Sequence, residues 1–246
     1  MQRTLLFILS LTMLVSLPSA ALAAQKAAPL TAEQVLDRHV AALGGREALS
    51  KVTSIVMKGR LEIPNQNLKG TVVSYAKAPN KKLEIVTIDG VGAQKEAFDG
   101  TNGWASDPFN GTRQLSGAEL GVLRRGARLD SEVNWREHWK SAELAGPKQI
   151  GGRDAYAVKL TPKEGEGTPV TNYYDAETFL LVRSELVQET PQGTMPVAIV
   201  PSDYRAVDGV MIPFAIDQEV AMMKVLVRFD EAKINAGVDD AMFAKP

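Results

Sequence analysis

Apolar and polar side chains alternate along most of this chain, beginning at residue 55. In the first run, Ile55, Met57, Leu61 and Ile63 alternate with Val56, Lys58, Arg60 and Glu62. Successive side chains of a β-strand point to opposite faces of a sheet, so this run predicts a strand with its first set buried. Similar runs occupy residues 71–77, 83–88, 93–98, 156–160, 170–174, 180–187, 197–204, 211–220 and 224–229. The pattern therefore predicts roughly ten strands.

Turn-forming dipeptides separate the predicted strands. They are Asp89-Gly90, Asp99-Gly100, Asn102-Gly103, Asn110-Gly111, Gly151-Gly152 and Asp208-Gly209. Asn-Gly and Asp-Gly supply the positive φ angles that tight hairpins require. Because most strands follow one another through short turns, without a strand–helix–strand rhythm, the sequence predicts a long antiparallel meander.

A helix is predicted near the start of the chain. Thr31 and Gln34 have the spacing of a capping box, in which each side chain bonds a backbone N–H near the other. Apolar residues then recur at helical spacing until Gly44 and Gly45, which end the helix. A short second helical turn is expected directly after these glycines.

A helical insertion interrupts the strands between residues 116 and 140. Its first part carries Leu120 and Leu123 and ends at a pair of arginines. Its second part, residues 130–140, is predicted to be a helix with Trp135 and Trp139 one turn apart on one face.

The first 24 residues differ from the rest in composition. Arg3 is followed by an apolar run through residue 15 and by small residues ending at Ala24. This order is typical of a cleavable secretory signal, and polar residues and a proline interrupt the ~20 apolar residues that a membrane span needs. We therefore expect residues 1–24 to be a signal peptide and residues 25–246 to form a single domain. The mature protein is then periplasmic or secreted.

Composition excludes several functions. Cysteine is absent, which rules out disulfides and a lipidated N-terminal cysteine. Without Arg3, 27 Lys+Arg remain against 29 Asp+Glu, a formal net charge of −2. That balance gives no basic face for nucleic acid, so no nucleic-acid partner is expected. A hydrophobic content of 45% suffices for a core without disulfides.

Residues suited to metal or covalent chemistry are scarce. His39 and His138 are the only histidines and stand far apart in the sequence. Signatures of serine hydrolases, zinc proteases, P-loops and dinucleotide-binding turns are absent. We expect no metal, no cofactor and no catalytic residue. A hydrolase that uses scattered carboxylates is the less favoured alternative.

Aromatic and methionine side chains are the candidate binding residues. Trp135 and Trp139 either attach the predicted helix to the sheet or roof an apolar cavity, where rigid rings give contact area at low entropy cost. Methionines such as Met57 fall in several predicted strands. Methionine is common at adaptable apolar surfaces and also in ordinary cores, so both interpretations stay open.

Several short segments of the sequence resemble segments of a known protein family. They are residues 97–100 with Gly103-Trp104, 115–119, 173–178 with 180–183, and 203–214, together with 36–49 and 240–246. In these the chain resembles an exported bacterial family of uncharacterised domains, similar in architecture to the outer-membrane lipoprotein-sorting proteins of the LolA/LolB-like superfamily. The resemblance covers nearly all of residues 33–246. It implies a mainly β fold, a half-open barrel made of a single highly curved antiparallel sheet, lidded by the N-terminal helix and the mid-chain helical insertion.

The resemblance also implies a function. In that superfamily the concave apolar face binds acyl chains, so we expect a periplasmic binding or carrier protein. Its partner would be a hydrophobic small molecule, a lipid or a lipidated protein, with transient contact to the membrane or to an envelope protein. The residues expected to line the cavity are Met57, Leu61, Val73, Tyr75, Leu120, Leu123, Trp135 and Trp139. The alternative is a non-catalytic structural or interaction domain whose interior is packed full.

Overall fold

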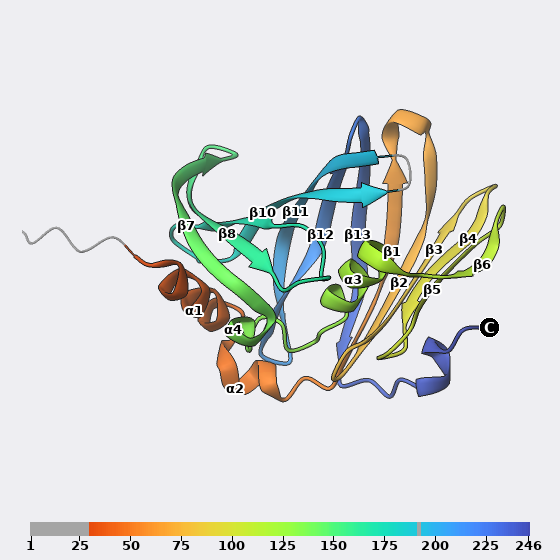
Figure 1. Cartoon of the computed structure of the whole chain (residues 1–246), viewed down its shortest axis with the longest axis horizontal. Helices are drawn as coiled ribbons and strands as arrows, with labels where there is room; N and C mark the ends of the chain where they lie inside the picture. Colours follow the sequence, from red (N-terminus) through yellow and green to blue (C-terminus); the bar gives the residue numbers. More distant parts are fainter. Residues whose placement is uncertain (1–29, 191–192) are drawn as a thin grey trace, which may run out of the picture.

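Thirteen strands form one antiparallel sheet in residues 30–190 and 193–246, the part of the chain that this computed structural model describes. The strand order is β6-β5-β4-β3-β2-β1-β13-β12-β11-β10-β9-β8-β7, so the first and last strands of the chain pair side by side. The sheet curves and stays open, with β6 and β7 at its two edges (Figure 1). The prediction of a single highly curved antiparallel sheet is confirmed.

The elements have the following bounds. The strands are β1 (Ser54–Ile63), β2 (Leu68–Lys77), β3 (Lys81–Ile88), β4 (Gly92–Phe98), β5 (Gly103–Asp107), β6 (Gly111–Gln114), β7 (Trp139–Ile150), β8 (Arg153–Pro162), β9 (Val170–Asp175), β10 (Leu181–Thr190), β11 (Gly193–Val207), β12 (Val210–Val220) and β13 (Met223–Ile234). The helices are α1 (Ala32–Ala42), α2 (Gly45–Ser50), α3 (Gly117–Gly126) and α4 (Trp135–His138), with short 3-10 turns η1 (Pro64–Gln66) and η2 (Asp240–Phe243).

The sequence pattern predicted ten of these strands and missed β5, β6 and β7. All four residues of β6 are exposed, and β7 contains no buried residue. Both are edge strands, and a strand that buries neither face shows no apolar alternation. β5 is only five residues long and follows a turn dipeptide, so its alternation is too short to detect.

Helix α1 begins and ends as the sequence predicts. The Thr31 hydroxyl accepts a hydrogen bond from the Gln34 backbone N–H at 3.3 Å, and the Gln34 side-chain oxygen accepts from the Thr31 N–H at 3.0 Å. The capping box is therefore confirmed. Gly44 follows with φ +119°, and a Cβ there would lie 2.2 Å from the Gly209 carbonyl oxygen. Glycine is required because the chain passes against the β11–β12 turn.

The helix predicted over residues 130–140 is wrong. Turns occupy residues 129–134, α4 spans only four residues, and Trp139 is the first residue of β7. Trp139 pairs with Pro162, and the strand continues along β8 to Ile150. Pairing with β8 overrides the local helical spacing of the two tryptophans, because tertiary contacts outweigh helix propensity.

One face of the sheet carries the helices, and we call it the inner face. Residues opposite each other in antiparallel strands share a face. Ile55, Met57, Leu61 and Ile63 pack together on the inner face, in a cluster that extends over β2, β3, β12 and β13 and includes Ala48 and Leu49 of α2. The predicted inward set of β1 is confirmed. Helix α1 packs over β8 and β9 on the same face, and α3 packs near β4 and β5 (Figure 1).

The outer face is covered in part by the C-terminal segment. Val238 and the fully buried Phe243 pack there against Val56 and Trp104. The Trp104 indole N–H donates a hydrogen bond to the Phe243 carbonyl oxygen at 2.9 Å. Val56 points outward as predicted for its set, but the end of the chain keeps it out of solvent.

The predicted signal peptide, residues 1–24, lies outside the described residues. Across the described ranges, none of the helices combines the length and the apolar character that a membrane span demands.

Candidate functional site

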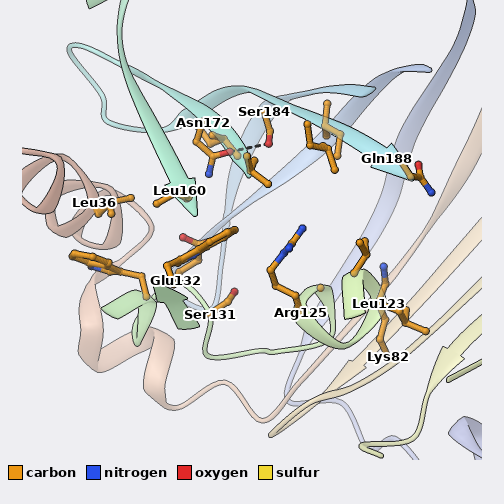
Figure 2. A pocket seen from close by; sticks show the side chains of 18 of the residues that line it. Leu36, Lys82, Leu123, Arg125, Ser131, Glu132, Leu160, Asn172, Ser184 and Gln188 are labelled. Atoms are coloured by element: carbon orange, nitrogen blue, oxygen red, sulfur yellow. Dashed lines mark hydrogen bonds between the residues drawn. The ribbon is translucent and has the colours of Figure 1, made fainter. Parts of the chain in front are cut away.

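A cavity of about 520 Å³ lies between the inner face and the helices. Its walls come from α1, α3, α4 and strands on both sides of the curved sheet, as Figure 2 shows. The lining residues are Leu36, Lys82, Glu96, Glu119, Val122, Leu123, Arg125, Gly126, Ser131, Glu132, Trp135, Trp139, Leu160, Val170, Asn172, Tyr174, Leu181, Ser184, Leu186, Gln188 and Ile199. This volume lies within the range of about 300–1,000 Å³ typical of small-molecule sites.

The wall on the side of α1 is mainly apolar. Leu36, Trp135, Leu160 and Tyr174 belong to one buried cluster that joins α1 and α4 to β8 and β9. Leu186 and Ile199 continue the apolar surface across β10 and β11. Because α1 rests on only part of the sheet, the cluster fills one end of the inner face and leaves the cavity beside it.

A row of polar side chains crosses this apolar wall. Asn172 and Ser184 stand opposite each other on β9 and β10, with the apolar Ile199 opposite Ser184 on β11. The Ser184 hydroxyl donates to the Asn172 side-chain oxygen at 2.8 Å, and the Asn172 amide donates to the Tyr174 hydroxyl at 3.1 Å. Burial raises the pKa of the Tyr174 hydroxyl, so it stays neutral. The row gives the cavity hydrogen-bonding groups without charge.

Arg125 extends from α3 into the cavity, toward the wall that carries Asn172 and Ser184 (Figure 2). Its guanidinium donates a hydrogen bond to the Glu166 backbone oxygen and lies 5.3 Å from the centre of the Trp139 ring. Burial lowers the pKa of Arg125, although arginine stays charged at neutral pH. The side chain therefore places a positive charge beside apolar walls.

Helix α3 is held close to the β8–β9 loop at this point. A Cβ on Gly121 would lie 2.3 Å from the Gly165 carbonyl oxygen, so only glycine permits the approach. Glu166, whose side chain is 7% exposed, pairs with Arg128 at 2.7 Å. These contacts fix the helix from which Arg125 extends.

Three carboxylates also line the cavity. Glu119 accepts two hydrogen bonds from Arg113, at 2.8 and 2.5 Å, and Glu132 lies 3.5 Å from Nε2 of the buried His39. The Glu96 side chain is exposed to solvent. Desolvation by the surrounding protein nevertheless raises the pKa of its carboxyl group, and the positive charge of Lys82 partly offsets this rise. In the described residues no group of three His, Cys, Asp or Glu side chains is placed to hold a metal ion.

The structure brings three of the eight predicted site residues to the cavity. Leu123, Trp135 and Trp139 line it. Leu120 lies nearby on α3 but packs over Gly103 and beside Phe98. Whether any of these side chains contacts a ligand stays a prediction.

The four predicted strand residues lie elsewhere. Met57 and Leu61 are on the inner face but within the packed cluster that β1, β2, β3, β12 and β13 form. Val73 pairs with Lys58, and Tyr75 pairs with Val56, so both belong to the outer face. Grouping Val73 and Tyr75 with Met57 was an error of register, because residues opposite an outward set are also outward.

Sequence reasoning missed Arg125, Asn172 and Ser184 as cavity residues. One of them had a detectable signal, since Asn172 lies between Val170 and Tyr174 on one face of a predicted strand. A polar side chain at such an inward position indicates a buried hydrogen bond or a binding surface. Arg125 gave no comparable signal, because its direction depends on how α3 is docked.

Comparison with known proteins bears on the fold. No protein-family model matches the chain, and no curated protein matches its sequence. Among solved structures, a DUF1329 family protein from Desulfovibrio piger superposes with a TM-score of 0.59 at 15% identity, covering 87% of this chain and 97% of that one. A LolA superfamily protein from Nitrosomonas europaea gives 0.59 at 16% identity, over 88% and 99% of the two chains. The fold is LolA-like.

A third solved structure agrees with this assignment. A domain described as an outer membrane lipoprotein-sorting protein, from Vibrio parahaemolyticus, gives a TM-score of 0.53 at 12% identity, over 86% of this chain and 97% of that one. The LolA-like fold that the sequence segments predicted is thus confirmed at the level of architecture.

Proposed function

We propose that this LolA-like protein is a non-catalytic carrier that binds the apolar part of a lipid or of a lipidated protein. The cavity between the inner face and α1, α3 and α4 supports the proposal most directly. Its volume suits a small ligand, and apolar side chains form a continuous part of its wall, from Leu36 on α1 to Ile199 on β11.

The energetics of an acyl chain fit such a site. Each buried CH₂ group contributes about 0.8 kcal/mol, so a chain of about 14–16 carbons contributes on the order of 10 kcal/mol if it is fully buried. Lost translational freedom and ordering of side chains offset part of this gain. A single chain therefore suffices for binding that is measurable and still reversible, as a carrier requires.

The proposal includes the setting in which the carrier works. We propose that residues 1–24 direct export, that residues 25–246 act as one domain in the periplasm, and that sorting of outer-membrane lipoproteins is its pathway. The predicted signal sequence supports export, and the likeness to the Vibrio parahaemolyticus domain supports the pathway. N-terminal sequencing of the exported protein should give a start near Ala24, whereas an intact Met1 would refute cleavage.

Native mass spectrometry of protein purified from the periplasm tests binding. We expect a species heavier than the chain by the mass of a lipid, and uptake of a fluorescent fatty acid after delipidation. A clean unliganded mass together with no uptake would favour the alternative, a structural or interaction domain.

A further inference from the structure

Arg125 is a cation in the cavity wall without a carboxylate partner. In the described part of the chain, no Asp or Glu oxygen lies within 4.0 Å of its guanidinium, although most other arginines have such a neighbour. Its hydrogen bond goes to a neutral acceptor, the Glu166 backbone oxygen, and one side faces the Trp139 ring. The guanidinium also lies beside Gly167 of the β8–β9 loop, and the side chain extends into the cavity (Figure 2).

Neighbouring carboxylates are engaged elsewhere. The Glu166 side chain pairs with Arg128, at 2.7 Å. Glu119 is held by Arg113, and Glu132 lies beside His39. Lys82, the second cation of the cavity wall, lies 3.5 Å from Glu84. Arg125 is thus the cavity cation whose charge the protein leaves without an ion pair.

Glu96 is the carboxylate that most needs to be considered as a partner. It lines the same cavity, but the charges that act on its pKa are those of Lys82, Glu84, Glu119 and Arg113. The charges that act on the pKa of Arg125 are Glu166 and Arg128. No Glu96 oxygen lies within 4.0 Å of the Arg125 guanidinium, so the two side chains form no ion pair.

We infer that the cavity selects amphiphiles with an anionic head group, a carboxylate or a phosphate, which pairs with Arg125 while the tail lies along Trp139, Leu160 and Ile199. This inference rests on the proposed carrier function and adds the class of ligand. A guanidinium binds both oxygens of such a head group through parallel N–H donors, and the apolar surroundings strengthen the pairing. Asn172, across the cavity, has a second amide N–H that can donate an uncharged hydrogen bond to the same head group, while the Ser184 hydroxyl holds its side-chain oxygen.

Three ligands that share the same 16-carbon chain and differ in head group test the inference on the full mature chain. Hexadecanoate, hexadecyl phosphate and the neutral hexadecanol compete against a neutral fluorescent apolar probe at pH 7.5. For the wild type we expect at least one anion to bind roughly 10- to 100-fold more tightly than hexadecanol. The preferred anion identifies the source of the head group, a free fatty acid or a phospholipid.

Variants locate the effect at Arg125. Arg125→Gln keeps a donor for the Glu166 backbone oxygen but removes the charge, so the anions should fall to the affinity of hexadecanol, which itself should not change. Arg125→Lys, which keeps the charge, should retain part of the preference. Arg124→Gln is the matched control, because Arg124 lies on the same helix outside the cavity, donates to the Gly165 carbonyl oxygen and lies 3.9 Å from the Glu166 carboxylate, which Arg128 continues to hold. It should leave all three affinities unchanged.

The outcomes separate this inference from the carrier function. If the wild type binds neither the probe nor any of the three ligands, the carrier function fails. If hexadecanol binds as tightly as both anions, or if the preference survives Arg125→Gln, the carrier function stands and the role of Arg125 is refuted. An equal loss in Arg124→Gln would also refute it, because a general effect of positive charge would then explain the preference.

Discussion

At the scale of the residue, Trp135 and Trp139 have different roles in the same cavity wall. Trp135 is 7% exposed, packs in the α1 cluster and donates its indole N–H to Asp37 at 3.2 Å. Trp139 is only half-buried and presents its ring to Arg125. Trp135→Ala should therefore lower the free energy of unfolding by about 3–5 kcal/mol in urea denaturation.

Trp139→Ala should act mainly on binding. We expect weaker uptake of a fluorescent fatty acid, with a smaller loss of unfolding free energy than Trp135→Ala causes, because the Trp139 ring covers the cavity more than the core. The comparison is made on both variants by probe titration and urea denaturation. If Trp139→Ala destabilises as much as Trp135→Ala while binding is unchanged, Trp139 is a packing residue.

Asp175 makes stability depend on pH. Its side chain is 3% exposed, and its carboxylate accepts hydrogen bonds from the backbone N–H groups of Glu177 and Thr178 and from the Thr178 hydroxyl. Burial opposes ionisation, but these bonds and Arg153 prevail and lower the pKa of Asp175. A pKa below the unfolded value of about 3.9 contributes stability that is present above that value and is lost as pH falls through the folded-state pKa.

Asp175→Asn tests this dependence. The variant should unfold about 1–3 kcal/mol more easily than the wild type at pH 7. The difference should shrink as pH falls below about 4, because the wild-type carboxylate is then protonated. Thermal or urea unfolding at several pH values measures it, and a difference that stays constant from pH 7 to pH 3 would contradict the assignment.

At the scale of the element, the C-terminal segment stabilises the outer face. Phe243 is fully buried in η2, whereas its neighbour Met242 is exposed. Phe243→Ala should cost about 3–5 kcal/mol of unfolding free energy, and Met242→Ala should cost little. A melting temperature of Phe243→Ala equal to that of the wild type would show that burial of this ring contributes nothing to stability.

Elements with a local signal were predictable from the sequence, and those defined by long-range pairing were not. The capping box of α1 depends on Thr31 and Gln34 alone, and β1 shows its own alternation. The strand that begins at Trp139 depends on β8 as a partner, and residues 130–140 taken by themselves favour a helix. The direction of Val73 depends on register with β1, which no single strand specifies.

At the scale of the whole molecule, the architecture followed from the sequence more fully than the cavity did. The number of alternating runs and their short turns define a long meander, and meanders of this length curve. The cavity depends instead on where α1 and α3 rest on that sheet, which no local pattern encodes. Leu123 and Trp135 were found because they are apolar residues of the helices that cover the sheet. Trp139 reaches the cavity from β7 and not from the predicted helix, and Arg125 was missed.

The positions of the three tryptophans allow the central claim, ligand binding in the cavity, to be tested with one titration. Trp135 and Trp139 line the cavity, while Trp104 is buried on the outer face under the C-terminal segment. A dibrominated fatty acid quenches only indoles that it contacts. Titrated into the wild type and into Trp104→Phe, it should give saturable quenching in both.

The fraction of fluorescence quenched at saturation decides the outcome. It should be larger in Trp104→Phe than in the wild type, because that substitution removes emission from an indole that a ligand in the cavity does not reach. Circular dichroism confirms that the variant is folded. Absence of saturable quenching, or a smaller quenched fraction in Trp104→Phe, would contradict binding of an apolar ligand in the cavity between the inner face and its helices.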